Sequence, residues 1–343
     1  MPDCRSCGGQ LLPGALACSH CHALVHADRL KELAREASEA TDPTERLRLW
    51  REALDLLPHG SRQAEAIRAR IAQDVQAVDT SPAPDDRSWL GRMAGAGGAL
   101  GTGALVLWKL KAFVFLALTK GKVLLLGLTK WKMMVSMFVS LGVYWAAFGW
   151  RFAVGLLASL YVHEMGHVFA LQRYGIRASA PMFVPGLGAF VRLDQYPQTV
   201  REDARVGLAG PVWGIAAALF AWGVGVAAGW PSWVAVGKVG GWLNLFNLIP
   251  FWQLDGSRGL RALDRTQRWL LLAVVAGMWM LTGDGILILI GAVLAFRIAT
   301  DTPPDEPSWD LFLTFAAVLA IGSGMTLIDV PGLDGTSRGT VGP

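Results

Sequence analysis

The stretch "SLYVHEMGHVFAL", residues 159–171, places three ionisable side chains inside an apolar run. His163 and His167 are four residues apart, so on an α-helix they lie on one face, one turn from each other. Glu164 lies about 100° around the same helix and cannot join that row. The H-E-x-x-H spacing is typical of two histidines that share a metal beside a carboxylate base. The alternative is a polar cluster packed without metal. Burying three ionisable groups in a membrane helix is costly, however, which favours a functional site.

The composition of the whole chain indicates whether water or lipid surrounds this stretch. Of its 343 residues, 53% are hydrophobic and only 17% are charged. Long apolar segments with few charges predict bilayer-spanning helices, and so an all-α polytopic membrane protein. The net charge of +4 is small, and the basic residues flank apolar segments. This pattern indicates contact with a lipid bilayer and no nucleic-acid partner. The first 25 residues lack a continuous apolar run, so we expect no cleavable signal peptide.

All four cysteines of the chain lie near its N-terminus. Cys4-x2-Cys7 and Cys18-x2-Cys21 are separated by ten residues. Each pair can place two sulfurs on one metal, and two pairs complete a tetrahedral zinc shell without an open position. Two disulfides are the alternative, which the expected absence of a signal peptide disfavours. We therefore expect residues 1–26 to form a zinc ribbon that holds a structural Zn²⁺ in a reduced, cytoplasmic environment.

Residues 27–79 are rich in charge and carry apolar residues at helical spacing. They predict a small soluble helical module with a weak likeness to a tetratricopeptide helix pair. Asp42-Pro43 predicts a helix start, because it combines a capping acceptor with Pro at the first helical position. The polar, Pro-containing residues 80–93 are expected to be a linker.

Residues 94–135 contain two short apolar runs that are separated by pairs of lysines. Neither run is long enough to span a bilayer, so we expect an amphipathic helix along the cytoplasmic interface, with a tilted spanning helix as the alternative. Beyond it we expect one crossing at about 133–150 and a return at about 152–172. A tight turn near Gly149 would separate the two, and one long helix is the alternative.

A second polar interruption lies downstream in "NLFNLIPFWQLDG", residues 244–256. Pro250 removes a backbone donor and ends the helix before it. Non-helical backbone at membrane depth is tolerated only where it lines a cavity. Asp255, followed by Gly256, is therefore the best candidate for the third protein ligand that a catalytic zinc needs beside an open position.

The two motifs together, HEMGH at 163–167 and N-x-x-P-x-x-x-L-D-G at 247–256, resemble the site-2 protease family of intramembrane zinc metalloproteases, peptidase family M50. The resemblance covers about 150–265. It includes "LAGPVWG", 208–214, and "PMFVPGLGAFVRLD", 181–194, which is similar to the family's small membrane-associated β-hairpin. It implies a catalytic core at 136–268. A second "LDG" at 333–335 lacks the Asn and the Pro of this motif, so it is not a candidate for the third ligand.

By this resemblance His163, His167 and Asp255 are the ligands of a catalytic zinc, and Glu164 is the general base. Asn247 is expected to contact the substrate backbone or the tetrahedral oxyanion, with a structural, carbonyl-capping role as the alternative. The implied reaction is cleavage of a single-span transmembrane protein inside the bilayer. The alternative function is a non-proteolytic metal-binding membrane scaffold, which would have no need of Glu164.

The basic residues also predict the orientation of the chain. Arginines cluster after the HEMGH helix, before the next span at about 206–229 and after Asp255: Arg173, Arg177, Arg201, Arg205, Arg258, Arg261, Arg265 and Arg268. By the positive-inside rule these ends and the N-terminus are cytoplasmic, and we expect a bacterial inner membrane. Residues 269–328 are expected to be C-terminal transmembrane helices, with 269–298 either a hairpin or one kinked span. Residues 329–343 are expected to be a disordered tail.

Overall fold

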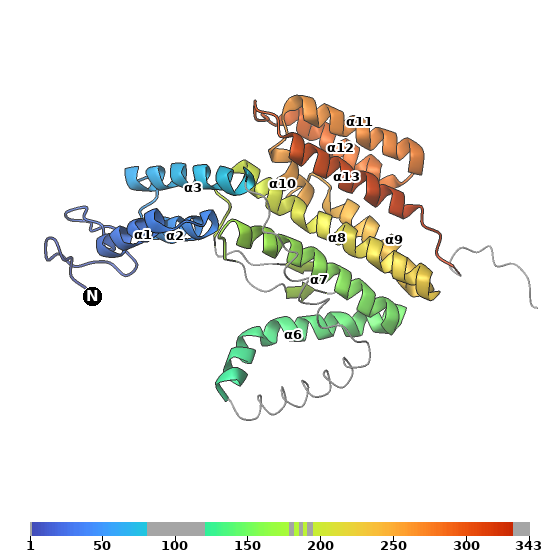
Figure 1. Cartoon of the computed structure of the whole chain (residues 1–343), viewed down its shortest axis with the longest axis horizontal. Helices are drawn as coiled ribbons and strands as arrows, with labels where there is room; N and C mark the ends of the chain where they lie inside the picture. Colours follow the sequence, from blue (N-terminus) through green and yellow to red (C-terminus); the bar gives the residue numbers. More distant parts are fainter. Residues whose placement is uncertain (1, 81–120, 178–181, 185–187, 191–194, 332–343) are drawn as a thin grey trace, which may run out of the picture.

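The computed structural model describes residues 2–80, 121–177, 182–184, 188–190 and 195–331, which form a small N-terminal part and a larger bundle of helices (Figure 1). The expected linker after residue 80 lies outside the described residues. So do most of the lysine-rich segment, the second "LDG" and the rest of the tail from residue 332.

Three helices follow the cysteine-rich N-terminus: α1 (Ala27–Glu39), α2 (Pro43–Asp55) and α3 (Arg62–Thr80). Asp42 caps α2 by accepting from the backbone N–H of Thr44, and Pro43 is the first helical residue, as the sequence predicts. The apolar positions at helical spacing are buried, with Leu33, Leu47 and Ile71 fully inaccessible to solvent. This core also contains Leu171 and Val206, so the module packs directly against the rest of the chain.

The bundle begins with two helices joined at one residue. α6 (Gly121–Phe148) and α7 (Trp150–Arg173) are separated only by Gly149, whose φ of 83° and ψ of 156° are accessible essentially to glycine alone. The tight turn expected near Gly149 is confirmed, and one continuous helix is excluded. However, α6 begins at Gly121, so it runs across the boundary expected at residue 135 between an interfacial helix and the first crossing.

Six further helices complete the described bundle: α8 (Val200–Ala228), α9 (Pro231–Asn247), α10 (Asp255–Arg261), α11 (Arg265–Thr282), α12 (Gly285–Thr300) and α13 (Trp309–Thr326). α8 packs against α7, α9, α10 and α13. Gly283 adopts a left-handed conformation after α11, and the Asp284 side chain caps α12. Residues 269–298 therefore form a hairpin of two helices, which decides between the two expected alternatives.

Among the described residues, three helices are long and apolar enough to cross a bilayer, namely α7, α8 and α13. Residues 134–148 of α6 and the whole of α12 are shorter apolar helices. Two short strands, β1 (Met182–Val184) and β2 (Gly188–Phe190), pair antiparallel beside α6, where the Phe183 N–H donates to Ser136 Oγ at 3.1 Å. The described part of the protein is thus mostly helical, with three helices that are candidates for crossing a membrane.

The two ends of the bundle differ in chemistry. Arg201 and Arg205, at the start of α8, pair with Asp310 at the start of α13, with N–O distances of 2.9 and 2.7 Å. The N-terminal module lies at this same end (Figure 1). At the other end the guanidinium of Arg151 lies over the rings of Trp150 and Trp230, at 5.5 and 5.4 Å. Such aromatic groups are typical of a membrane–water interface.

The Gly149 turn makes a direct prediction for stability. A Cβ at Gly149 would meet no atom within 4 Å, so Gly149→Ala pays only for its backbone conformation, on the order of 1–3 kcal/mol. Gly142 in α6 has equally open surroundings but helical geometry. Gly142→Ala should therefore be neutral or stabilising by up to about 1 kcal/mol. Thermal unfolding of both variants in detergent measures the difference, and equal midpoints would contradict this account of the turn.

Candidate metal centre

Three donor atoms from α7 and α10 converge inside the bundle. His163 Nε2 lies 3.3 Å from His167 Nε2 and 3.2 Å from Asp255 Oδ2, and His167 Nε2 lies 3.3 Å from Asp255 Oδ1. All three residues are at most 9% exposed. The structure therefore brings together the three ligands predicted from the sequence.

The size of this triangle fits a metal ion. A tetrahedral zinc with metal–ligand distances of about 2.0–2.1 Å has ligand–ligand edges of about 3.3–3.4 Å. The observed edges of 3.2–3.3 Å match one face of such a tetrahedron. Two imidazoles and one carboxylate are also a donor set that zinc accepts. Three protein ligands leave the fourth vertex open.

The second nitrogen of each imidazole is held by another element. His167 Nδ1 lies 2.8 Å from the Val206 carbonyl of α8, which can only accept, so Nδ1 carries the proton. His163 Nδ1 lies 3.0 Å from Asn244 Oδ1 of α9. The Asn244 amide in turn donates to the Gly240 carbonyl at 2.7 Å, which points its oxygen at the ring. Both rings therefore present an unprotonated Nε2 to the metal position, an arrangement typical of metal-bound histidines.

Two further residues belong to the site: Asn244, which from the sequence is expected to have only a structural role, and Val206, which the sequence does not identify. Asn244 precedes Asn247 by three residues, so the two amides share one face of α9. That spacing is the signal that could have found Asn244. Val206 contributes only its backbone carbonyl, for which a side-chain motif contains no signal.

Two glycines of α8 give the histidines their space. A Cβ at Gly210 would lie 2.1 Å from His167 Nε2, and one at Gly214 would lie 2.3 Å from Asn244 Oδ1. Any larger residue would therefore displace either a donor nitrogen or the amide that orients it. This contact explains physically the "LAGPVWG" segment, 208–214, which the sequence analysis identified only by its resemblance.

A break in the helical backbone brings Asp255 to the site. α9 ends at Asn247, Pro250 follows, and Trp252 adopts a left-handed φ of 48° before α10 begins at Asp255. A Cβ at Gly256 would lie 1.9 Å from the Leu248 carbonyl oxygen, so only glycine lets α10 start against the end of α9. As the "PFWQLDG" sequence predicts, the helix ends before Asp255, and the break places this side chain beside the histidines.

Two further predicted residues lie beside the triangle. Asn247 Nδ2 is 3.4 Å from His163 Nε2, so its amide is next to the donor atoms themselves. Glu164 follows His163 directly on α7 and is partly exposed. Its side chain is therefore less buried than those of the two histidines and Asp255.

The four cysteines near the N-terminus form a second cluster, far in sequence from the first. The Sγ–Sγ distances are 3.7 Å for Cys4–Cys21 and 3.7 Å for Cys7–Cys18, too long for disulfides. They match the edges of about 3.8 Å expected for a tetrahedron of sulfurs around zinc. Backbone N–H groups of Cys21 and His20 donate to the Cys18 thiol and lower its pKa to about 6, which favours the metal-binding thiolate.

The two cysteine pairs also fold alike. The N–H of Gly8 donates to the Cys4 carbonyl at 2.8 Å, and the N–H of His22 donates to the Cys18 carbonyl at 2.9 Å. Gly8 and His22 both adopt positive φ, 72° and 57°. The residue after each C-x-x-C thus turns the chain in the same way. Two equivalent turns that face one another are what a four-cysteine zinc ribbon requires.

Comparison with known proteins finds similarity to zinc metalloproteases in the helical core of the chain. The model of peptidase family M50 matches residues 151–238. The zinc metalloprotease MJ0392 of Methanocaldococcus jannaschii is 28% identical over 126 residues, 35% of this chain and 35% of the relative. The putative zinc metalloprotease Rip3 of Mycobacterium tuberculosis is 32% identical over 165 residues, 46% of this chain and 38% of the relative.

The matches thus span little more than a third of the length of these relatives. No solved structure matches the chain. The matched segment contains α7 with both histidines and α8 with the glycines that pack on them. Over this core the chain is similar to peptidase family M50, the site-2 protease family that its two motifs resemble.

Proposed function

We propose that this protein is an intramembrane zinc metalloprotease that cuts transmembrane segments of membrane proteins. The observation that carries the proposal is the triangle of His163, His167 and Asp255, with its edges of 3.2–3.3 Å and with Glu164 beside it on the same helix. A metal-binding scaffold needs such a triangle but has no use for the neighbouring carboxylate.

The chain supplies the following chemistry in this proposal. His163, His167 and Asp255 would hold a zinc ion, which would supply Lewis-acid chemistry and a water activated near neutral pH. Glu164 takes a proton from the attacking water and passes it to the leaving amine. The Asn247 amide, beside the donor atoms, donates a hydrogen bond to the substrate carbonyl oxygen as negative charge develops on it.

The two histidines lie closer to the C-terminal end of α7 than to its N-terminal end. His167 precedes the end of α7 at Arg173 by six residues, or about 9 Å along the helix axis. The arginine-rich end of the bundle is cytoplasmic by the positive-inside rule, and so is the N-terminal module beside it. The substrate in this proposal is a single-span membrane protein. Its helix must unwind first, because its peptide bonds are engaged in their own hydrogen bonds.

The cysteine cluster holds a second zinc with a structural role in this proposal. Its four thiolates fill a tetrahedral shell, so no position is left for water or substrate. The support is the pair of 3.7 Å sulfur–sulfur distances and the two matching turns.

Glu164→Gln and Asp255→Ala should separate the two roles at the catalytic site. Glu164→Gln should keep the metal and lose about 10²–10⁴-fold in cleavage rate, because only the proton transfer is removed. Asp255→Ala should lose metal and activity together, because two imidazoles alone hold zinc poorly. Zinc content and cleavage of a single-span test substrate are measured on purified protein.

The matched control is Asp264→Ala, which removes a carboxylate that caps α11 rather than one that faces the histidines. It should retain zinc and activity. Wild-type cleavage by Glu164→Gln would sink the assignment of the base, and full zinc occupancy in Asp255→Ala would sink the third ligand.

The structural zinc is tested by metal analysis of the full chain. We expect about two zinc ions per chain in the wild type and about one when all four cysteines are replaced by serine, since each cluster completes one shell. The remaining zinc should depend on Asp255. Equal zinc content in the wild type and the four-serine variant would contradict the ribbon assignment.

A further inference from the structure

One ion pair joins the N-terminal module to the bundle in a fully buried place. Arg51 of α2 is 2% exposed and Glu202 of α8 is 0% exposed, and the guanidinium donates to the carboxylate across 151 residues of sequence. Arg51 Nε also donates to the Tyr174 carbonyl, just after α7, at 3.0 Å. In the described ranges, no other Arg–carboxylate pair is buried on both sides.

Arg51 is also the cation that compensates the buried charge of Glu202. The other partner of this carboxylate is the Gln198 N–H, at 2.9 Å, which is a neutral donor. Thr199 caps α8 by accepting from the Glu202 N–H at 3.1 Å, so Glu202 belongs to the first turn of that helix. A buried charge that loses its partner is strongly destabilising. The start of α8 therefore depends on the docked position of α2.

The same elements continue directly into the metal centre. Val206 lies one turn after Glu202 on α8, and its side chain is buried in the module core with Leu47 and Trp50. Its carbonyl is the acceptor that holds His167 Nδ1 at 2.8 Å. On α7, Leu171 lies one turn after His167 and packs in that same core. The module thus contacts both helices one turn or less from the hydrogen bond between them.

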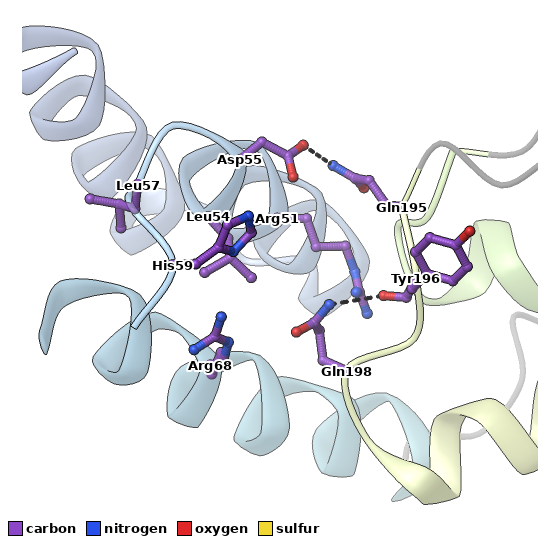
Figure 2. Close-up of a pocket in the computed structure, with 9 residues that line it drawn as sticks. All are labelled: Arg51, Leu54, Asp55, Leu57, His59, Arg68, Gln195, Tyr196 and Gln198. Atoms are coloured by element: carbon purple, nitrogen blue, oxygen red, sulfur yellow. Dashed lines mark hydrogen bonds between the residues drawn. The ribbon is translucent and has the colours of Figure 1, made fainter. Parts of the chain in front are cut away.

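Packing beside Arg51 is not continuous. A cavity of about 290 Å³ lies between α2, α3 and the segment before α8, and Figure 2 shows Arg51 among the residues that line it. Across it, Gln195 Nε2 donates to Asp55 Oδ2 at 2.6 Å, a contact between exposed side chains. Exposed contacts of this kind contribute little. Elsewhere at the junction, Asp79 of α3 accepts from Tyr174 Oη at 2.6 Å and pairs with Arg205 at 2.9 Å. Beside the cavity, the buried ion pair is the contact that neutralises the start of α8.

We propose that Arg51 is a positioning residue of the metal centre: by docking the N-terminal module on α7 and α8, it holds the Val206 carbonyl against His167. The proposal rests on the metal centre proposed above and assigns the module a part in it. An imidazole that loses its orienting acceptor can rotate, and loss of such a partner typically costs 10–100-fold in metal affinity. The module is then a component of the zinc site rather than an appendage.

The test measures zinc affinity by chelator competition in the full-length four-serine variant, so that only the bundle site contributes. Arg51→Met in this background should lower zinc affinity by about tenfold, the lower end of that range. Hydrogen exchange should become faster in residues 168–176 and 200–208. The control is Arg46→Met, which removes an ion pair to Asp74 inside the module, and which should change neither quantity.

Two further variants keep the test decisive. Arg51→Met/Glu202→Gln removes both charges and should recover most of the zinc affinity, because no unpaired buried charge remains. If Arg51→Met fails to fold, Arg51→Lys keeps the charge but not the fork of donors, and should lower zinc affinity by about threefold.

Unchanged zinc affinity in a folded Arg51→Met or Arg51→Lys protein would overturn the proposal, and so would an equal loss in Arg46→Met. If the four-serine reference itself bound no zinc, the metal centre would be wrong. That outcome differs from one in which the reference binds zinc and a substitution at position 51 leaves the zinc affinity unchanged. The second outcome would overturn only the role of Arg51.

Discussion

The structure depends on one requirement: two imidazole lone pairs and one carboxylate must meet inside an apolar bundle. Each Nε2 is free only because its Nδ1 proton is donated elsewhere, to the Val206 carbonyl and to Asn244. α8 must then pass within contact distance of both rings, which Gly210 permits. α9 must end early enough for Asp255 to reach back. The glycines, the helix break and the amide are consequences of the same geometric demand.

The N-terminal module extends this argument to the arginine-rich end of the bundle. α7 and α8 are tied to each other at the histidines and tied to α2 one turn further on, through Arg51 and Val206. A partner that bound the module would therefore act on the same two helices that carry the site. Such coupling needs no contact with the metal, only a change in how the two helices are held together.

The sequence predicted the ligand triangle because His163, His167 and Asp255 stand in motifs whose spacing follows from helix geometry. It also predicted the cap at Asp42 and the turn at Gly149, which depend on local residue chemistry. It did not identify the carbonyl of Val206, since a backbone atom has no sequence signature. Nor did it predict the docking of Arg51, a contact between residues 151 positions apart that arises only from tertiary packing. Local rules carry no information about such contacts.

The most direct test of the central claim is zinc X-ray absorption on the full-length protein with its four N-terminal cysteines replaced by serine. The account predicts one zinc per chain, as in a single three-ligand site. The shell should hold four nitrogen or oxygen atoms at about 2.0–2.2 Å, with imidazole scattering from two histidines and no sulfur. Absence of bound zinc, or a shell without imidazole scattering, would contradict it.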